Sequence, residues 1–459
     1  MDKKRILFYN TSRGGIVYYR TITPMIELER QDDSKKFHVE FLSELNFSKP
    51  ETLDYLKSFD IIHYHKYLTP DIQTAIYITG ELKSAGVKLV LDIDDYWHLH
   101  KNHPLYGLVK ENNHHETILF NLNLADYITT TTEIFAEEIK GVTKKDNVVV
   151  LYNSVNPEWM DQFKNNWKED PNGLVRITYM GGSSHLKDLE QLDGVVNVLN
   201  ADIHTRNKFK IILAGWDSGG YITKTILNTE LQKELLGLKL WTQKTVQEIN
   251  KSKGNIDLVK SIPQHLKDRF RNNMFIKDKR EIETKESAYY GYEKILTNNY
   301  SIIKDKSYYR WLMNFEINGI YSGNEGNFGR RWTQKENQYA KVLDETDIVL
   351  APLEDIKFNN FKSNLKQVEC WTRKLPVICS DMPPYNIYGK DMENCLLIPP
   401  KKNAKKYWIK ALKKLISDKN LRIRIGEGLH DTFMEKFNLK NVTKTRIEFY
   451  EKIINEKGE

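Results

Sequence analysis

The chain has few cysteines and no long apolar segment. Three cysteines occur among 459 residues, and no two of them show the C-x-x-C spacing of many zinc and redox sites. We therefore expect buried, unpaired thiols and a reducing compartment. No apolar run approaches the roughly 18 residues of a membrane-spanning helix, and the charged first residues contain no signal-peptide core. These absences predict a cytoplasmic protein, with peripheral contact to the inner face of a membrane left open.

The charge balance is only mildly basic. Lys and Arg number 69 against 62 Asp and Glu, which gives a formal net charge of +7. Such an excess fits an anionic ligand, a membrane surface or a nucleic acid, and does not choose among them. With 40% hydrophobic and 29% charged residues, the composition is that of a globular chain rather than a disordered one.

Apolar, strand-like runs alternate with helical patterns along most of the chain. This alternation predicts parallel strands joined by right-handed helical crossovers, which defines an α/β fold. A polar stretch at residues 157–173 separates two such series, so we expect two Rossmann-like domains. The expected strands are residues 5–10, 37–42, 60–67, 87–93, 125–131 and 147–153 in the first series, and 174–182, 209–216, 346–353, 375–381 and 394–400 in the second.

The resulting domain scheme has three parts and one insertion. Residues 1–160 form the first domain, residues 170–400 the second, and residues 401–459 a run of terminal helices. Residues 217–325 interrupt the second domain, which is far more chain than one crossover needs. This insertion is rich in Lys and Tyr and predicts a helical subdomain. Its aromatic residues either form a small core or offer a platform for an acceptor or partner.

The first candidate ligand loop is residues 10–15, which follows the first strand. Ligands of open α/β sheets bind beyond the carboxyl ends of the strands, where this loop lies. Gly14 and Gly15 would let the backbone approach a ligand closely before a helix begins. The loop does not complete the G-x-G-x-x-G pattern of dinucleotide-binding proteins.

A second glycine loop, residues 179–188, again follows a strand and precedes a helix. Gly181 and Gly182 could present amide groups to a diphosphate, Ser183 a hydroxyl and Lys187 a positive charge. The spacing is not that of a P-loop.

A third candidate is the start of the helix expected at residues 364–373. Ser363 or Asn364 would cap it, and its unpaired amides suit an anion. Lys362 and Lys366 would strengthen anion binding, and Glu369 could accept hydrogen bonds from a ribose. The apolar residues that follow place this helix inside the domain.

The fourth candidate is a cluster of carboxylates at the end of a strand, Asp92-Ile-Asp-Asp95. Asp92 and Asp94 form a D-x-D pair that resembles a divalent-metal site, or a raised-pKa acid beside an ionised base. Helix capping with solvent exposure is the alternative explanation. His63 and His65 end the preceding strand, and we interpret both as structural.

Four segments together resemble retaining GT-B glycosyltransferases of the large group that includes bacterial mannosyl- and glucosyltransferases. The segment ADYITTTTEIF is similar to a strand and helix of that family, and VVVLYNSVNPEWM to the segment before its linker. YMGGSSHLKDLEQL resembles the family's donor loop. FKSNLKQVECWTRKLPVICSD resembles its donor helix and the strand after it, and is the most specific of the four.

The resemblance implies roles for individual residues. Glu369 matches a glutamate that binds the donor ribose, and Lys187 a lysine that binds phosphate. The residues that meet the diphosphate in the family correspond to Asn364, Leu365 and Lys366 at the helix start. Gly14 and Gly15 match the first-domain loop that touches the diphosphate or the acceptor.

Three positions depart from the family pattern. Phe361 stands where the family has a glutamate that contacts the donor sugar, which leaves the sugar unspecified. Gly182 stands where a phosphate-binding arginine is expected, and Arg331 is our candidate to compensate. Asp94, followed by Asp95, takes the place of a histidine at the end of a first-domain strand.

The resemblance implies transfer of a sugar from a nucleoside diphosphate donor, UDP or GDP, to a hydroxyl, with retention at the anomeric carbon. Asp94 or Asp95 would orient the acceptor or act as base, and no cofactor or metal is required. A divalent metal at Asp92 and Asp94 is a secondary hypothesis. The acceptor would be a glycan, a lipid-linked molecule or a protein, in glycan or polysaccharide synthesis. The alternatives are a glycosyltransferase that modifies nucleic acid and an inactive nucleotide-sugar-binding scaffold.

Overall fold

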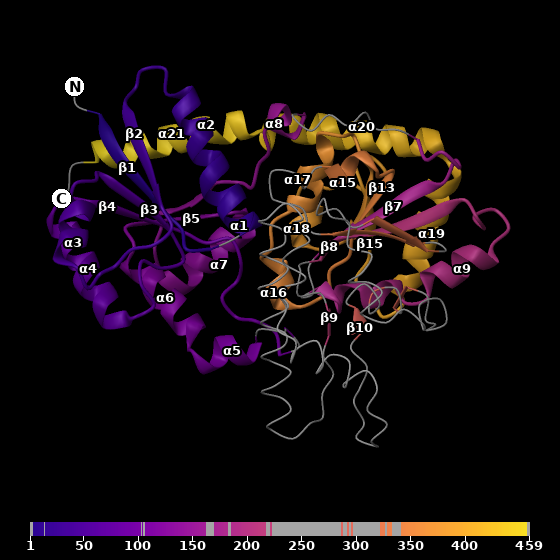
Figure 1. Ribbon diagram of the computed structural model, residues 1–459, viewed down its shortest axis with the longest axis horizontal. Helices are drawn as coiled ribbons and strands as arrows, with labels where there is room; N and C mark the ends of the chain where they lie inside the picture. Colours follow the sequence, from indigo (N-terminus) through magenta and orange to yellow (C-terminus); the bar gives the residue numbers. More distant parts are fainter. Residues whose placement is uncertain are drawn as a thin grey trace, which may run out of the picture.

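The computed structural model describes two parallel sheets that lie side by side, each covered by helices (Figure 1). The described residues are 3–12, 14–101, 103, 106–161, 169–181, 185–216, 221–222, 286–287, 292, 295–296, 322–325, 328–332 and 341–456. The α/β class with two Rossmann-like halves is confirmed. Nearly all of the expected helical insertion at residues 217–325 lies outside the described residues.

The first sheet has six parallel strands in the order β2-β1-β3-β4-β5-β6. All six expected strands are present, each within a few residues of its predicted bounds. The strands are β1 (Lys4–Tyr9), β2 (Phe37–Leu42), β3 (Ile61–His65), β4 (Lys88–Asp92), β5 (Tyr127–Thr130) and β6 (Val148–Val150). The helices of this half are α1 (Gly15–Val17), the π-helix η1 (Tyr18–Ile22), α2 (Thr23–Gln31), α3 (Pro50–Lys57), α4 (Ile72–Ser84), α5 (Tyr106–Glu111), α6 (His114–Leu124) and α7 (Glu133–Thr143).

Alternate residues of these strands enter two separate cores, because successive side chains of a strand point to opposite faces. In β1, Leu7 and Tyr9 pack with residues of α3, α4, α6 and α7 on one face of the sheet. Ile6 and Phe8 pack on the other face against α2. Burial on both faces explains why the strands read as nearly continuous apolar runs.

The second sheet has the order β11-β12-β8-β7-β13-β14-β15, and only β11 is antiparallel to its neighbour. Its strands are β7 (Val175–Met180), β8 (Phe209–Trp216), β11 (Ser322–Glu325), β12 (Phe328–Trp332), β13 (Ile348–Ala351), β14 (Val377–Ser380) and β15 (Leu396–Ile398). The other elements around it are α8 (Pro157–Asp161), η3 (Asp188–Leu192), α9 (Val195–Ala201), the short paired strands β9 (Tyr221–Ile222) and β10 (Glu286–Ser287), α15 (Lys341–Asp344), α16 (Lys357–Asn360), α17 (Leu365–Trp371) and α18 (Pro383–Asn386).

One helix and one strand of this half differ from the prediction. The single helix expected after the second glycine loop is two pieces, the 3₁₀ helix η3 and the helix α9. They are separated at Gly194, which has a left-handed φ of 64°. The strand β12 was not predicted, because its sequence FGRRW has a glycine and two arginines and forms no apolar run. It still pairs in parallel with β8, near the edge of the sheet.

Three terminal helices complete the chain: α19 (Ala404–Ser417), α20 (Lys419–Lys436) and α21 (Leu439–Asn455). Helices α19 and α20 pack on the second sheet, through residues such as Trp408 and Phe433. Helix α21 lies along the first half instead (Figure 1), where Phe449, Tyr450 and Ile453 join the core that contains β1. The last helix therefore ties the two halves together.

The cysteines and the apolar helices can now be compared with the expectations from the sequence. Cys370, Cys379 and Cys395 are all buried and unpaired, which confirms the expectation for the thiols. Among the described residues, no helix is both long enough and apolar enough to cross a bilayer.

Candidate functional site

A cavity of about 540 Å³ lies between the two halves. Its walls come from the segments that follow β1 and β4 in the first sheet, and β7, β8 and β13 in the second. Both sheets therefore direct the carboxyl ends of their strands at the same space. In each sheet the chain order reverses beside the cavity, between β1 and β3 and between β7 and β13. Such a switch point is where open α/β sheets bind ligands.

Many of the residues singled out from the sequence lie on this wall. They are Gly15, Asp94, Asp95, Gly181, Lys362, Ser363, Leu365 and Lys366. Gly14 is the N-cap of α1, directly before Gly15, and has a positive φ of 70°. Gly182 and Ser183 lie outside the described residues. The donor or acceptor roles of all these residues stay predictions.

Two glycines meet where β7 and β8 end. A Cβ added at Gly181 would lie 2.6 Å from the Tyr179 hydroxyl, which is too close for any side chain. A Cβ at Gly215 would lie 3.1 Å from the Gly181 amide nitrogen, and Gly215 has a left-handed φ of 96°. Gly215 was not predicted, because the strand before it gives no sign of a neighbouring loop. Together the two glycines let backbone line this part of the cavity.

Cationic and imidazole side chains line the second-half wall. Lys362 is half-buried, and its ammonium lies 4.9 Å from the centre of the Phe358 ring. His185 Nδ1 lies 2.7 Å from Asp188 Oδ2. Burial, followed by the charge of Lys362, lowers the pKa of His185. Lys362 is thus a positive charge at the cavity beside an imidazole that favours its neutral form.

Asp188 connects the segments that form the second-half wall of the cavity through buried hydrogen bonds. Its Oδ1 accepts a hydrogen bond from the Glu354 amide at 2.7 Å and one from Asn359 Nδ2 at 3.1 Å. The residue is 5% exposed and joins the start of η3 to the segment that precedes α17. No feature of the sequence suggested this role, because the residues involved are separated by more than 160 positions.

Glu369 does not reach the cavity surface. It is 1% exposed, and the Tyr19 hydroxyl donates a 2.9 Å hydrogen bond to its Oε1. Lys366 Nζ lies 3.1 Å from its Oε2. Tyr19 lines the cavity from the first half, so it stands between Glu369 and the space where a ligand would lie. Ribose binding by Glu369 therefore stays a prediction and requires Tyr19 to move.

Two other predicted donor residues lie away from the wall of this cavity. Lys187 is exposed and pairs with Glu190 at 2.6 Å, beside a smaller depression of about 40 Å³. Arg331 lies on β12, and its Nε donates to Glu345 at 2.7 Å. Phosphate binding by Lys187 and Arg331 stays a prediction, because the resemblance and the sequence order do not fix where a side chain turns.

Phe361, which the resemblance sets against a sugar-binding glutamate, is buried in an aromatic cluster. Its ring centre lies 4.7 Å from that of Tyr96 and 5.5 Å from that of Phe135, both in the first half. Lys357 stacks over the rings of Tyr96 and Phe361 and pairs with Glu138 at 2.8 Å. This position joins the two halves instead of presenting a polar group to the cavity.

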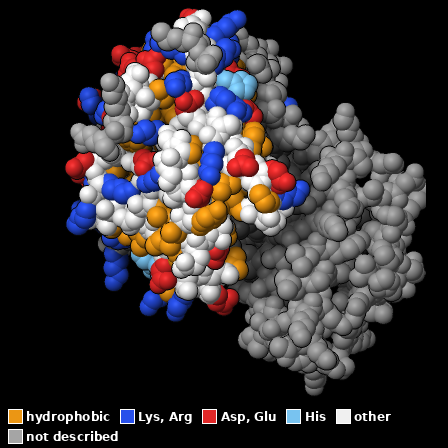
Figure 2. Space-filling model, turned by 90° about the vertical axis from the view of Figure 1, so that its left-hand side faces the viewer, with side chains coloured by type: hydrophobic (Ala, Val, Ile, Leu, Met, Phe, Trp, Pro, Cys, Tyr) orange, Lys and Arg blue, Asp and Glu red, His pale blue; other side chains and the backbone are white. Residues whose placement is uncertain are grey.

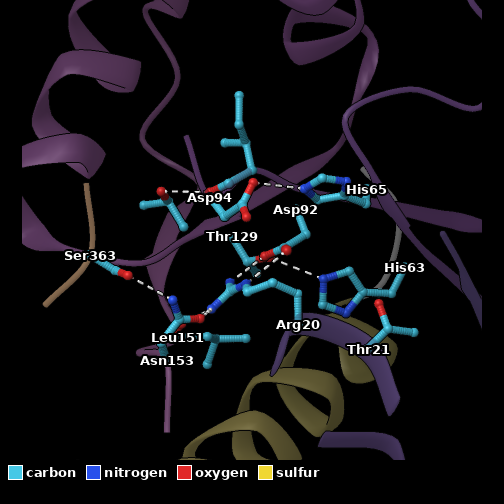
Figure 3. Close-up of polar contacts among 12 residues, drawn as sticks. Arg20, Thr21, His63, His65, Asp92, Asp94, Thr129, Leu151, Asn153 and Ser363 are labelled. Atoms are coloured by element: carbon cyan, nitrogen blue, oxygen red, sulfur yellow. Dashed lines mark hydrogen bonds and ion pairs between the residues drawn. The ribbon is translucent and has the colours of Figure 1, made fainter. Parts of the chain in front are cut away.

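Arg20 was missed from the sequence and is the centre of a buried network (Figure 3). Its guanidinium makes a two-pronged ion pair with Asp92, with a 2.9 Å bond from Nε to Oδ2. It also donates to the Leu151 carbonyl at 2.7 Å and to Asn153 Oδ1 at 3.1 Å. Asn153 Nδ2 in turn donates to Ser363 Oγ at 2.8 Å. This chain of contacts connects the first sheet to the residues that precede α17.

The network continues through the first sheet to the last helix. Thr129 donates to Asp92 Oδ1 at 2.7 Å and lies 3.0 Å from His63 Nε2. His63 Nδ1 lies 2.5 Å from the Tyr450 hydroxyl on α21. Burial lowers the pKa of His63 to about 3. A neutral His63 with hydrogen bonds at both ring nitrogens agrees with the structural interpretation of this residue.

Asp92 is not placed as a metal ligand beside Asp94. Both of its carboxylate oxygens bind Arg20, and the side chain is only 5% exposed. Among the described residues, no group of three or more His, Cys, Asp or Glu side chains could hold a metal ion. The metal hypothesis for Asp92 and Asp94 stays untested, and the ion pair argues against it.

Asp94 lies at the cavity and has a different set of partners. His65 Nε2 lies 2.9 Å from Asp94 Oδ1, and Lys66 Nζ lies 3.8 Å from the same oxygen. Burial alone would raise the pKa of Asp94, but the charges of His65 and Lys66 hold it well below its usual range. Asp94 is therefore an ionised carboxylate suited to accepting a hydrogen bond. Asp95 lies beside it on the same wall.

Comparison with known proteins places the fold but gives no sequence family. No protein-family model matches the chain, and no curated protein sequence matches it either. Solved structures match over the whole chain, and they are glycosyltransferases of the two-domain GT-B class. The two parallel sheets and the cavity between them are therefore a GT-B fold.

Three of these structures illustrate the likeness. A glycosyltransferase from Rickettsia africae superposes with a TM-score of 0.54 and 12% identity, over 100% of both chains. Sucrose-phosphate synthase from Thermosynechococcus elongatus gives a TM-score of 0.53 and 11% identity, over 99% of this chain and 100% of the other. HepE from Anabaena, in complex with UDP, gives a TM-score of 0.52 and 10% identity, over 98% and 100%.

Proposed function

We propose that this chain is a glycosyltransferase that moves a sugar from a nucleoside diphosphate to an acceptor hydroxyl. The observation that carries the proposal is the cavity between the two sheets, whose two walls differ in charge. The second half contributes Lys362 and Lys366, whereas the first half contributes Asp94 and Asp95, together with Arg20, whose charge is paired with Asp92. A diphosphate suits the cationic wall, and a hydroxyl donor suits the carboxylates.

The proposed donor is a UDP-sugar. This choice is supported by HepE, which shares the fold and whose structures are described as complexes with UDP and with UDP-glucose. Gly181 and Gly215 line the cavity with backbone and no side chain, which suits the close approach of a phosphate. A hexose as the transferred sugar, and retention at its anomeric carbon, belong to the same proposal and rest on the sequence resemblance.

In this proposal, catalysis is mainly electrostatic. Charge develops on the diphosphate as its bond to the sugar breaks, and fixed cations stabilise that charge best in a partly enclosed site. Lys362 and Lys366 would supply them from one wall. Asp94 would hold the acceptor hydroxyl from the other, at the distance that closure of the two halves sets.

The alternative of a nucleic-acid substrate finds no support on the face of the molecule in Figure 2. On the described part of the face in Figure 2, Lys and Arg side chains are interspersed with Asp and Glu, and no continuous basic surface covers it. A nucleic-acid track requires clustered positive charge along one path.

The test is a thermal-unfolding screen of the full chain with UDP, GDP, ADP and CMP, each with and without EDTA, followed by their sugar conjugates. A ligand that binds only the native state raises the melting temperature by mass action. We expect UDP and UDP-sugars to stabilise the chain with or without EDTA, followed by release of UDP from the productive sugar. Stabilisation by none of the ligands would contradict the proposal. Binding without any turnover would indicate the inactive scaffold.

A further inference from the structure

Three side chains form a line that ends at the cavity: Ser12, His65 and Asp94. Ser12 Oγ lies 3.0 Å from His65 Nδ1, and His65 Nε2 lies 2.9 Å from Asp94 Oδ1. His65 and Asp94 are close because β3 and β4 are parallel neighbours, with His65 in register with Asp92. Asp94 follows two residues later, beyond the carboxyl end of β4. Figure 3 shows the imidazole of His65 facing the Asp94 carboxylate.

The Asp94 carboxylate fixes one hydrogen of His65. An ionised carboxylate can only accept, so His65 Nε2 carries a hydrogen and donates it to Asp94. The other ring nitrogen, Nδ1, faces the Ser12 hydroxyl, which can donate to it or accept from it and so holds the ring in place. The Ser12 amide donates to Asn10 Oδ1 at 2.9 Å, which holds the serine in place after β1.

The surroundings of Asp94 show which groups control its charge. His65 and Lys66 face it from the end of β3, Arg20 from η1, and Asp95 from its own loop. Arg20 is already committed to the buried Asp92. His65 is the partner at hydrogen-bond distance, and its side chain is only 3% exposed. The imidazole is therefore well ordered but lies behind the carboxylate, out of reach of a ligand.

We propose that His65, held in place by Ser12, is a positioning residue that aims the Asp94 carboxylate at the acceptor hydroxyl. The inference rests on the proposed function and selects Asp94 over Asp95 as the acceptor-binding carboxylate. One oxygen of Asp94 is held by His65, which leaves the other to accept a hydrogen bond from the substrate. The effect of His65 is exerted through Asp94, not by contact with the substrate.

The test uses water as the acceptor, so that no acceptor has to be known. The rate of UDP release from UDP-glucose is measured against pH for the wild type, His65→Leu, His65→Gln, Ser12→Ala and Asp94→Asn. We expect His65→Leu to lower kcat by about 10- to 100-fold, the worth of a hydrogen bond to a charged group, with UDP affinity unchanged. The acidic limb of the pH–rate profile of His65→Leu moves to higher pH, because Asp94 loses the partner that keeps it ionised. His65→Gln, whose amide can still donate, recovers most of the rate.

Further measurements separate this role from a structural one. Nitrogen-15 NMR of labelled histidines reports which ring nitrogens carry hydrogen, and we expect a hydrogen on Nε2 of His65 in the wild type and a lower occupancy of that position in Asp94→Asn. A loss of rate with an unmoved acidic limb, or a wild-type Nδ1–H tautomer, overturns the proposal while the glycosyltransferase assignment stands. If the wild type neither binds nor releases UDP, the proposed function fails first and this inference falls with it.

Discussion

Tyr19 of the first half and Glu369 of the second are joined by a 2.9 Å hydrogen bond from the tyrosine hydroxyl to Oε1. The other carboxylate oxygen is held by Lys366, so both oxygens of Glu369 have protein partners. A ribose can reach this glutamate only after Tyr19 turns away. The contact joins two residues separated by 350 positions and two different halves of the molecule.

The first prediction is that Tyr19→Phe tightens UDP binding. The phenylalanine keeps the ring but removes the hydroxyl that competes with the ligand for Glu369. We expect the Kd for UDP to fall roughly three- to tenfold, which corresponds to about 0.7–1.4 kcal/mol. Isothermal titration calorimetry measures it directly.

Tyr18→Phe is the matched control, because Tyr18 precedes Tyr19 in the chain and packs edge-on against its ring. The Kd of Tyr18→Phe for UDP should stay near that of the wild type. Weaker binding by Tyr19→Phe would mean that the hydroxyl contacts the nucleotide itself. Glu369→Gln should weaken binding in either case if Glu369 holds the ribose.

The second prediction compares Lys362 and Lys187, which were both predicted from the sequence to bind the diphosphate. Lys362 lines the cavity, whereas Lys187 is exposed and pairs with Glu190. We expect Lys362→Met to raise the Kd for UDP about tenfold and to reduce its dependence on salt, since one charge contact with the diphosphate is lost. Lys187→Met should change the Kd by less than about twofold. The reverse order of effects would show that the resemblance locates the phosphate better than this geometry does.

The sequence predicted the scaffold because strand and helix patterns are local. Alternation and apolar runs located eleven strands, and the loop positions followed from the rule that ligands lie beyond strand ends. Gly181 and Lys362 could therefore be named from their place in the chain alone. The strand β12 escaped because two arginines and a glycine hide its pattern.

The partners of the site could not be predicted, because they come from distant segments. Arg20 lies in the middle of a helical pattern, where a lone arginine is typical of a solvated face. Its buried role depends on Asp92, which is 72 positions away. Tyr19 likewise gains its importance only when the two halves face each other, and Gly215 only when β7 and β8 pair. A single sequence does not reveal which side chains meet across a domain boundary.

The third prediction concerns the stability of the Arg20–Asp92 ion pair. Both side chains are 5% exposed or less, so removal of one partner leaves an uncompensated buried charge. We expect Arg20→Met or Asp92→Asn to lower the free energy of unfolding by about 3–5 kcal/mol. Urea denaturation followed by circular dichroism measures the change. The double variant should lose less than the sum of the two, because no charge then stays unpaired; additive losses would contradict the pairing.

The fourth prediction concerns the loss of stability of the fold in acid. Burial lowers the pKa of His63 to about 3 in the folded chain, whereas an unfolded histidine titrates near 6.5. Between these values the unfolded state binds a proton that the folded state does not. The contribution of His63 to the free energy of unfolding is therefore complete above about pH 6.5. It falls as the pH drops toward 3, by at most about 1.4 kcal/mol per pH unit. Asp92, whose pKa Arg20 lowers against the effect of burial, adds to the loss at lower pH.

Urea denaturation at several pH values between 5 and 7.5 tests this for the wild type, His63→Gln and His38→Gln. His38 is the matched control, because its side chain is 53% exposed on β2 and lies outside the buried network. His63→Gln should be less stable than the wild type at pH 7.5, since its bonds to Thr129 and Tyr450 are disturbed. Its stability should also depend less steeply on pH, because the unfolded chain no longer gains a proton at this position. An unchanged slope in His63→Gln, or a flatter one in His38→Gln, would mean that the acid sensitivity resides elsewhere than in the link between β3 and α21.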